Sequence, residues 1–433
     1  MEVKNIKTIK KPIDAAVSVP GSKSITNRAL LIASLAKGKT RLNNALFSDD
    51  SHFFAGSLTQ LGFEVEMDEP NKTISVVGLG GVIPAKKADL FIGNAGTAAR
   101  FLSAFLTIAH GTYHLDGEPR MRERPIGDLV DALKKIGVTI DGTLNAKTLQ
   151  ICPPVTINAK GLAGGSTQIS GEISSQYLSA LMMVAPYASR PFVLDVVNEL
   201  NSKPYVDMTA RVMADFGVEL ERDEYRQFTI RKGEYSAKDT YTIESDASAA
   251  SYFFALPALC DGRVIVKNIR KNSIQGDIQF LDVLEKMGLT VKELNDSIEV
   301  SFDRNKSILR GVDINMAHIP DTAQTLAVIA PFAENPTTIR GIASARMKET
   351  DRVSATCSEL RSLGVMVEEF DDGMKIYPCE DLRPATIKTY KDHRMAMAFS
   401  LIGARIDGVL IEDPACVSKT FPNFFDVLEE VSK

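Results

Sequence analysis

A pattern of polar loops followed by small and apolar residues recurs six times along this chain of 433 residues. Each loop leads into a run of small and apolar residues that predicts a buried helix. The helices are expected to begin near Ser24, Gly96, Ser175, Asp246, Asp321 and Asp392, at intervals of 71 to 79 residues. A fixed period of this length indicates one repeated supersecondary unit. Six similar helix N-termini are therefore expected, and such termini attract anions.

Each copy also contains a second, amphipathic helix that is followed by a short alternation of apolar and polar residues. Five of these helices end in an apolar residue and a glycine, at Gly62, Gly137, Gly217, Gly288 and Gly364. Glycine just past a helix is typical of a left-handed C-cap, and the alternation predicts a half-buried strand. The sixth copy, residues 424–431, ends with the chain. Its missing strand is expected from the N-terminus, residues 5–19.

The six copies divide into three and three, which predicts an α/β fold of two domains. The first three buried helices open with Ser, Gly and Ser, and the last three open with Asp. A chain of this length also favours two domains over one. We place one domain at residues 21–243 and the other at residues 1–20 and 244–433. Because the chain crosses between them twice, a hinge and an interdomain cleft are expected.

Composition favours a soluble cytoplasmic enzyme and excludes several other classes of protein. Hydrophobic residues make up 44% and charged residues 24%, which is ordinary for a globular protein. The five cysteines are scattered without a CxxC pair, so reduced thiols are expected rather than disulfides or a metal site. A net charge of −5 argues against a nucleic-acid partner. The sequence shows no signal peptide and no apolar run of membrane-spanning length, so no membrane partner is expected.

Basic residues stand where helix stability would favour acidic ones. A cation beside the positive end of a helix dipole is best explained by an anion bound between them. Four amphipathic helices are preceded by a basic residue, at Arg124, Lys203, Lys348 and Lys419. Pro125, Pro204 and Pro422 are expected to be the first helical residues of three of them. The buried helices add Lys23, Arg28 and Arg394.

These basic residues outnumber the acidic residues beside them. When Arg352 is added and Lys203 is left out, these basic residues number seven. Only two acidic residues, Asp321 and Glu349, stand near them in the sequence. The resulting surplus of positive charge suits a small, highly charged substrate. The same loops supply neutral donors for phosphate. These donors are Ser22, Ser24, Asn94, Gly96, Thr97, Ser174, Ser175, Gln176 and Ser202.

The acidic residues at the loops have a structural interpretation. Asp246, Asp321 and Asp392 all stand where an N-cap belongs, and Asp is a preferred cap. Glu349 suits the first turn of a helix, and His393 suits a packed histidine. Spacing alone does not make any of them catalytic.

Long motifs in this chain resemble the EPSP synthases (3-phosphoshikimate 1-carboxyvinyltransferases), in order and over nearly the whole length. The motifs are PGSKSITNRALLIAS at 20–34, GNAGTAAR at 93–100, EPRMRERPIG at 118–127, SSQY at 174–177, SKPYVD at 202–207, DASAASYFF at 246–254, NSIQGD at 272–277, IPDTA at 319–323, KETDR at 348–352, DHRMAMAFS at 392–400 and KTFPNFF at 419–425.

The resemblance implies a fold, a reaction and two substrates. The fold is two domains of three βαβαββ repeats each, an inside-out α/β barrel. The reaction moves the enolpyruvyl group of phosphoenolpyruvate to the 5-hydroxyl of shikimate 3-phosphate and releases phosphate, in the shikimate pathway to aromatic amino acids. The resemblance implies no metal and no organic cofactor. A monomer is expected.

The resemblance also implies roles for individual residues. Asp321, Glu349 and Lys23 are expected to be catalytic, with Glu349 protonating C3 of phosphoenolpyruvate and Asp321 taking the hydroxyl proton. The residues expected to bind shikimate 3-phosphate are Lys23, Ser24, Arg28, Ser174, Ser175, Gln176, Ser202, Asp321 and Lys348. The residues expected to bind phosphoenolpyruvate are Lys23, Gly96, Arg124, Gln176, Arg352, Arg394 and Lys419.

Two positions depart from the family pattern. Ala99-Arg100-Phe101 replaces a common Met-Arg-Pro, so Phe101 adds a large ring that must pack against a neighbour. Ser344 stands where asparagine is frequent.

Two alternatives to the main interpretation stay open. One is the fold relative that transfers enolpyruvate to UDP-N-acetylglucosamine, which usually carries a reactive cysteine in the loop equivalent to residues 110–125. This chain has no cysteine there. The other is a non-catalytic sugar-phosphate binding protein, against which Asp321 and Glu349 argue together.

Overall fold

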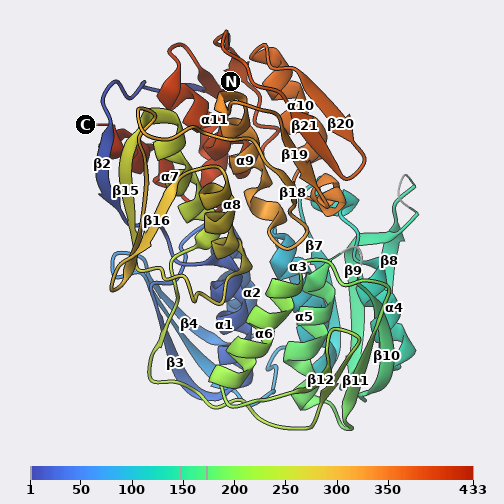
Figure 1. The fold of residues 1–433 in the computed structure, drawn as a ribbon. Helices are drawn as coiled ribbons and strands as arrows, with labels where there is room; N and C mark the ends of the chain where they lie inside the picture. Colours follow the sequence, from blue (N-terminus) through green and yellow to red (C-terminus); the bar gives the residue numbers. More distant parts are fainter. Residues whose placement is uncertain (1, 147–148, 172–173, 433) are drawn as a thin grey trace. The chain divides into compact units, whose positions relative to one another are not determined.

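The computed structural model describes residues 2–146, 149–171 and 174–432. The chain divides into two compact units, which we call unit 1 (Met1–Pro20 with Glu244–Lys433) and unit 2 (Gly21–Ile243). The α/β fold class is confirmed, because helices and strands alternate through both units (Figure 1). In the described ranges the strands form six separate open sheets, so no single sheet closes into a barrel.

Unit 2 contains six helices and three four-stranded sheets within the described residues. The sheet orders are β14-β3-β5-β4, β6-β7-β9-β8 and β10-β11-β13-β12. The helices are α1 (Lys23–Leu35), α2 (Asp49–Gln60), α3 (Gly96–Phe105), α4 (Gly127–Lys135), α5 (Ser175–Val184) and α6 (Lys203–Asp215). The strands are β3 (Lys37–Asn43), β4 (Glu64–Asp68), β5 (Thr73–Leu79), β6 (Lys87–Phe91), β7 (His110–Asp116), β8 (Thr139–Leu144), β9 (Ile151–Lys160), β10 (Gly165–Ser170), β11 (Phe192–Val197), β12 (Glu221–Asp223), β13 (Gln227–Ile230) and β14 (Tyr241–Thr242).

Unit 1 repeats the same plan, with sheet orders β16-β17-β15-β2, β18-β19-β21-β20 and β1-β23-β22. Its helices are α7 (Ala247–Cys260), α8 (Phe280–Lys286), α9 (Ala323–Ile329), α10 (Arg352–Ser362), α11 (His393–Arg405) and α12 (Phe424–Val431). Its strands are β1 (Val3–Asn5), β2 (Ile13–Val17), β15 (Gly262–Lys267), β16 (Thr290–Glu293), β17 (Ser297–Phe302), β18 (Asp313–Asn315), β19 (Thr337–Arg340), β20 (Val367–Phe370), β21 (Gly373–Ile376), β22 (Thr386–Ile387) and β23 (Leu410–Glu412).

The N-terminal segment supplies two strands to unit 1, where one was expected. β1 pairs antiparallel with β23 and takes the place of the missing strand of the sixth copy. β2 pairs in parallel with β15 in the sheet of the fourth copy. Pro12 stands directly before β2, and proline cannot donate a backbone hydrogen bond to a sheet, which helps to separate the two strands.

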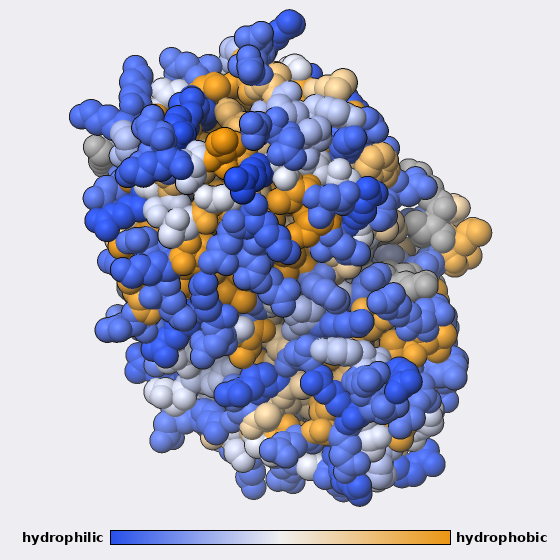
Figure 2. Space-filling view, viewed as in Figure 1, coloured by the Kyte–Doolittle hydropathy of each residue, from blue (hydrophilic) through white to orange (hydrophobic). Residues whose placement is uncertain are grey.

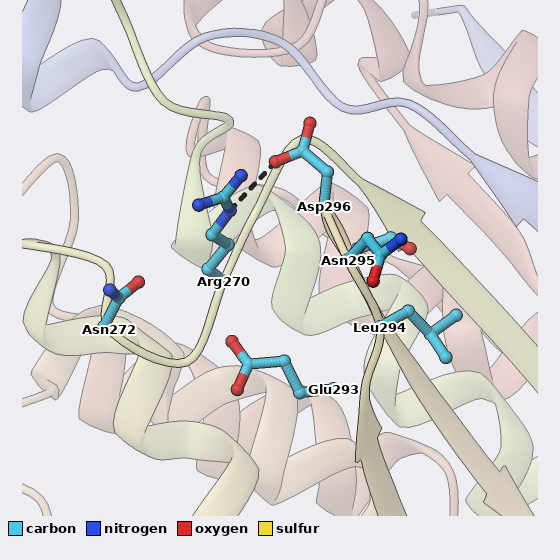
Figure 3. A pocket seen from close by; sticks show the side chains of 7 residues that line it. Arg270, Asn272, Glu293, Leu294, Asn295 and Asp296 are labelled. Atoms are coloured by element: carbon cyan, nitrogen blue, oxygen red, sulfur yellow. Dashed lines mark hydrogen bonds and ion pairs between the residues drawn. The ribbon is translucent and has the colours of Figure 1, made fainter.

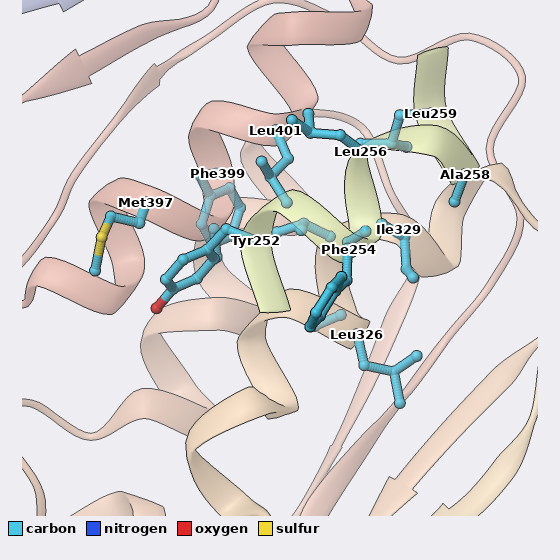
Figure 4. Packing of buried hydrophobic residues seen from close by; sticks show 14 of the residues in the cluster. Tyr252, Phe254, Leu256, Ala258, Leu259, Leu326, Ile329, Met397, Phe399 and Leu401 are labelled. Carbon is cyan, nitrogen blue, oxygen red and sulfur yellow. The ribbon is translucent and has the colours of Figure 1, made fainter. Parts of the chain in front are cut away.

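Three helices from successive copies form the centre of unit 1. α7, α9 and α11 pack on one another, and every residue of α7 is buried. Figure 4 shows apolar side chains of these helices gathered in one cluster, with Phe254 next to Leu326 in this view. The small residues along these helices allow close packing, as the sequence pattern predicted. Unit 2 uses α1, α3 and α5 with α6 in the same way.

The helix ends confirm part of the sequence interpretation. The five glycines after the amphipathic helices all have positive φ, from +90° at Gly137 to +103° at Gly288. Asp246 and Asp392 are N-caps, whose side chains accept hydrogen bonds from the backbone N–H groups of Ala249 and Arg394, both at 2.9 Å. The left-handed glycine caps and these two aspartate caps were therefore predicted correctly.

Several predicted helix starts are wrong by two or three residues. α4 begins at Gly127 after Ile126, α10 at Arg352 after Asp351, and α12 at Phe424. Pro125 and Pro422 therefore precede the helices, and Glu349 lies before α10 rather than in its first turn. The sequence pattern did not resolve these helix starts from the turns before them.

The molecular face in Figure 2 is mainly hydrophilic, with hydrophobic side chains scattered over it. The larger exposed hydrophobic residues come from distant parts of the sequence, such as Val82, Leu149 and Met366. Single exposed apolar residues of this kind are ordinary on a protein surface. Among the described residues, no helix combines the length and apolar character needed to span a membrane.

Gly403→Ala should destabilise unit 1, because the N-terminal segment packs against α11 at this glycine. A Cβ at Gly403 would lie 2.6 Å from the Cβ of Ile6, which is buried. We expect a loss of roughly 1–3 kcal/mol, typical of overpacking, measured by urea unfolding.

The matched control is Gly56→Ala in α2, where a Cβ meets nothing within 4 Å. This change should stabilise the protein by roughly 0.5–1 kcal/mol, the usual gain of Ala over Gly within a helix. Equal effects of the two substitutions would contradict the close contact at Ile6.

Candidate functional site

Arg352 lies at the centre of a buried cluster of charges in unit 1. It opens α10, is 3% exposed, and donates to three carboxylates. Its Nε lies 2.7 Å from Asp392 Oδ2, its Nη1 lies 3.0 Å from Asp321 Oδ1, and its Nη2 lies 2.8 Å from Glu349 Oε2. Burial alone would lower the pKa of Arg352, but the carboxylates of Asp392, Glu349 and Asp321 raise it above its usual value.

Asp321 bridges two arginines and is not the helix cap that the pattern predicted. Its second oxygen, Oδ2, accepts from Arg394 Nη2 at 2.9 Å. Asp321 lies inside a 3₁₀ turn, Pro320–Thr322, and Thr322 takes the N-cap position of α9. This turn moves the helix start past Asp321, whose carboxylate is engaged by the two guanidinium groups instead.

Glu349 joins Arg352 to a third cation. Lys419 Nζ lies 3.5 Å from Glu349 Oε1, and both side chains are largely buried. Lys419 ends the 3₁₀ turn Pro414–Lys419. Two candidate acids and three candidate anion ligands, predicted from four separate motifs, therefore meet in one cluster. Lys348 is the residue directly before Glu349.

Neighbouring residues complete this cluster and were missed as site residues by the sequence analysis. Tyr252 Oη accepts from Arg394 Nη1 at 3.4 Å, and burial raises its pKa to about 12. Asp277 is buried and accepts a hydrogen bond from Ser248. Burial, and then the charge of Asp321, raise the pKa of Asp277 to about 7. The sequence carried no signal for Asp277 beyond its place in the NSIQGD motif.

Unit 2 pairs the first predicted lysine with an aspartate. Lys23 is the first residue of α1, and its Nζ lies 3.7 Å from Oδ2 of Asp50 in the first turn of α2. Asp50 is buried and was not predicted. An acid in the first turn of a helix is favoured by the helix dipole alone, so its position gives no separate signal for a site.

Arg124 is held beside the start of α3. Its Nη1 donates to the backbone oxygen of Asn94 at 3.0 Å and to Asn94 Oδ1 at 3.1 Å. A Cβ at Gly96 would lie 2.3 Å from Arg124 Nη2, so only glycine leaves room for this guanidinium. The next residue, Pro125, is anchored because its oxygen accepts from Arg100 Nη2 at 2.8 Å and from Tyr177 Oη at 2.6 Å.

Gln176 and the predicted serines cluster at the starts of α5 and α6. Ser174 is the N-cap of α5, and its Oγ accepts from the backbone N–H of Gln176 at 3.3 Å. Gln176 Nε2 donates to Thr97 Oγ1 at 3.3 Å, which joins α5 to the start of α3. Ser175 is the first residue of α5 and is 6% exposed. Ser202 precedes α6 with a left-handed φ of +56°, an uncommon backbone conformation for serine.

Arg28 is buried within unit 2 among neutral groups. Its donors reach Thr209 Oγ1 at 2.7 Å, the Ser24 oxygen at 2.9 Å, the Tyr205 oxygen at 3.1 Å and Ser179 Oγ at 3.3 Å. Burial lowers the pKa of Arg28 to about 10. A buried cation whose partners among the described residues are all neutral is suited to accept an anion.

Not every predicted cation belongs to a site. Lys203 pairs with Glu199 at 3.5 Å and lies over the Tyr225 ring at 5.5 Å, so its position is explained by local contacts. A surface pocket of unit 1 contains none of the predicted site residues (Figure 3). There, Arg270 is paired with Asp296 at 3.1 Å, with Asn272 and Glu293 beside them.

The expected cationic surplus is smaller than the sequence indicated. In unit 1, Arg352, Arg394 and Lys419 share their surroundings with three carboxylates, because Asp392 is an ion-pair partner as well as a cap. In unit 2, Asp50 offsets part of the charge of Lys23. The sequence count left out Asp392 because it was interpreted only as a helix cap, and it left out Asp50 because this residue lies in a different segment from Lys23.

Asp277→Asn should remove a pH dependence of stability. The folded-state pKa of Asp277 is about 7, above the value of about 3.9 for an unfolded chain, so the folded protein binds the extra proton. The corresponding stability is complete below about pH 4 and is lost as the pH rises through 7.

As the pH rises from 5 to 8, the melting temperature of Asp277→Asn should therefore rise relative to that of wild type. Thermal melts at unit intervals of pH measure this shift. A difference that stays constant over that range would contradict the raised pKa.

Comparison with known proteins gives one consistent result. The family profile of EPSP synthase (3-phosphoshikimate 1-carboxyvinyltransferase) matches residues 7–428. A relative from Nostoc punctiforme named 3-phosphoshikimate 1-carboxyvinyltransferase is 49% identical over 425 residues, which cover 98% of this chain and 98% of the relative. A chloroplastic relative of that name from Nicotiana tabacum is 49% identical over 437 residues, covering 98% of this chain and 84% of the relative.

The fold agrees with a solved structure. EPSP synthase from Acinetobacter baumannii matches with a TM-score of 0.82 at 23% identity, covering 100% of this chain and 98% of that one. This likeness shows the shared fold. Because the profile covers nearly the whole sequence and relatives match almost half of its residues, the chain belongs to the EPSP synthase family.

Proposed function

We propose that this chain transfers the enolpyruvyl group of phosphoenolpyruvate to the 5-hydroxyl of shikimate 3-phosphate and releases phosphate. The product is 5-enolpyruvylshikimate 3-phosphate, in the pathway to aromatic amino acids. Family membership supports this proposal, and the names of the relatives favour it over UDP-N-acetylglucosamine as acceptor and over a non-catalytic role. The observation that carries it is the buried cluster in which Asp321 and Glu349 share Arg352.

In unit 1, the cations are proposed to bind phosphoenolpyruvate by exchange. Arg352 and Arg394 suit a carboxylate, because the planar guanidinium can bind it through two hydrogen bonds. Their donors already bind Asp321 and Glu349, so an incoming carboxylate takes over part of these contacts. The exchange frees oxygens of the two acids for proton transfer. Phosphoenolpyruvate binding and the release of these carboxylate oxygens therefore occur in the same step.

The phosphate of phosphoenolpyruvate is assigned to Lys23, Arg124 and Lys419, with Gly96 and Gln176 beside them. Gly96 supports this assignment because its missing side chain leaves room for Arg124. As phosphate leaves, these cations stabilise its growing charge.

Shikimate 3-phosphate is assigned to groups from both units. In unit 2, Arg28 and Ser24 would hold the carboxylate, while Ser174, Ser175 and Ser202 would hold the phosphate together with Lys23 and Gln176. In unit 1, Asp321 and Lys348 would bind the ring hydroxyls. Arg28 has the strongest physical support, since it is buried and all of its hydrogen-bond partners are neutral. The expected interdomain cleft stays a prediction.

Proton transfer follows from the two acids. Glu349 donates a proton to C3 of phosphoenolpyruvate, which leaves C2 electrophilic, and the 5-hydroxyl attacks C2 as Asp321 takes its proton. The tetrahedral intermediate then loses a C3 proton and expels phosphate, with Lys23 assisting near the phosphate. Each positioned acid or base contributes roughly 10²–10⁴ in rate. The reaction needs no metal or organic cofactor, and we propose a cytoplasmic monomer without nucleic-acid or membrane partners.

Phosphate release tests the reaction and the two acids together. The wild-type protein should release phosphate from phosphoenolpyruvate with shikimate 3-phosphate and not with UDP-N-acetylglucosamine. Asp321→Asn and Glu349→Gln should each lower kcat by roughly 10²–10⁴, because the amides cannot exchange the proton. Glu349→Gln should also slow the exchange of solvent deuterium into C3 of phosphoenolpyruvate.

Asp313→Asn is the matched control, since Asp313 also pairs with an arginine, Arg340 at 3.0 Å, but on the surface. It should retain wild-type kcat. Full activity of Asp321→Asn would remove Asp321 from proton transfer, and a preference for the UDP-sugar would overturn the proposed reaction.

Gly96→Ala should weaken the binding of phosphoenolpyruvate by displacing Arg124. The added Cβ would lie 2.3 Å from Arg124 Nη2, at the flexible end of that side chain. Losing one charge-assisted contact should raise KM for phosphoenolpyruvate by roughly tenfold to a hundredfold. Steady-state kinetics measures this change, with Gly56→Ala as the control for a Gly-to-Ala change in a helix. An unchanged KM would mean that Arg124 does not bind this substrate.

A further inference from the structure

We propose that Phe101 is a positioning residue that holds the guanidinium of Arg28 in the orientation in which it receives the carboxylate of shikimate 3-phosphate. This inference rests on the proposed function, because it uses the assignment of Arg28 to that substrate. It adds a specificity-determining role for an aromatic side chain that does not itself touch the substrate.

The contact between the two side chains is direct. Arg28 Cζ lies over the Phe101 ring, 5.3 Å from its centroid. Phe101 is fully buried and Arg28 is 1% exposed, so water does not compete for this contact. The negative face of an aromatic ring attracts a cation, and the attraction is stronger where both groups are desolvated.

Arg28 depends on this ring because its other partners are neutral. Across the described residues, no carboxylate lies within ion-pair distance of Arg28. Its partners are two hydroxyls, of Thr209 and Ser179, and two backbone oxygens, of Ser24 and Tyr205. Burial lowers the pKa of Arg28 to about 10, so the site favours the charged form less than water does.

The hydrogen bonds of Arg28 also restrict how an anion can approach. A guanidinium has five N–H donors in one plane, and four of them are used by the protein here. Among the described residues the remaining donor is on Nη1, and the Cζ atom of the group lies over the Phe101 ring. A ligand carboxylate must therefore approach the edge that carries Nη1. An aliphatic side chain could fill the same volume but would offer no negative face to the cation.

Core packing alone is the competing explanation, and the same helix provides a control for it. Phe105 lies one helical turn from Phe101 in α3 and is also fully buried, but its ring packs against Phe63 at 5.8 Å. Phe105→Leu therefore creates a similar loss of ring volume in α3 without removing an aromatic face from Arg28.

The test compares the binding of two ligands by calorimetry. One is shikimate 3-phosphate, and the other is its analogue with a hydroxymethyl group in place of the carboxylate. Phe101→Leu should weaken binding of shikimate 3-phosphate by roughly tenfold or more, the loss of a desolvated cation–π contact. It should leave binding of the analogue within about twofold of wild type. Phe105→Leu should leave the ratio of the two affinities unchanged.

Kinetics provide a second readout. Phe101→Leu should raise KM for shikimate 3-phosphate with little change in kcat, and Phe101→Tyr, which keeps the ring, should restore most of the affinity. If Phe101→Leu does not fold, Phe101→Met replaces it, since Met has similar length and no ring. Unchanged discrimination between the ligands in the ring-free variant, or an equal loss in Phe105→Leu, would overturn the inference.

The outcomes also separate this inference from the proposed function. If wild type binds both ligands equally, Arg28 does not bind the carboxylate, and both the assignment and this inference fail. If wild type discriminates and Arg28→Lys loses that discrimination while Phe101→Leu keeps it, only the role of Phe101 is wrong.

Discussion

The buried guanidinium of Arg352 is the constraint on which the arrangement of unit 1 depends. Removing an arginine from water is unfavourable by several kcal/mol unless carboxylates surround it. Three carboxylates do so, and each comes from a different element: Asp321 from the turn before α9, Glu349 from the segment before α10, and Asp392 from the cap of α11. The Arg352 side chain therefore fixes the positions of both proposed acids. Three separate ion pairs on the surface would hold the acids less firmly, because exposed pairs are weak.

The two units handle buried arginines in opposite ways. In unit 1, Arg352 and Arg394 bind carboxylates of the protein, so the substrate carboxylate that we propose to bind there would replace an existing partner. In unit 2, Arg28 is held by hydroxyls, backbone oxygens and an aromatic ring, so an anion adds a counter-charge where the described partners supply none. In the proposed mechanism, exchange of carboxylates at Arg352 frees acids for proton transfer, whereas the addition of an anion at Arg28 favours substrate binding. The chemistry assigned to each unit follows this difference.

The features that follow from local sequence could be predicted, and those that depend on distant contacts could not. The six buried helices, the left-handed glycines such as Gly217, and the caps Asp246 and Asp392 all follow from residues a few positions apart. The bridging role of Asp321 needs Arg394, which is 73 residues away, and the contact of Arg28 with Thr209 spans 181 residues. Asp50 lies in the first turn of a helix, where an acid is favoured without any function. No sequence feature marked Asp277 as a site residue beyond its place in the NSIQGD motif. Family resemblance supplied the candidate residues, but it did not supply the ion pairs among them.

The repeat explains why one fold can hold both kinds of site. At equivalent helix starts, unit 2 has Ser174 and Gly96, which leave the positive ends of helix dipoles uncompensated by acids. Unit 1 has Asp246 and Asp392, which cap their helices with negative charge. Neutral helix starts favour the phosphate groups proposed to bind there, and the cap of α11 places the Asp392 carboxylate beside Arg352. The residue that opens a buried helix, Ser or Gly in unit 2 and Asp at α7 and α11 in unit 1, therefore decides whether the helix start is neutral or already carries a carboxylate.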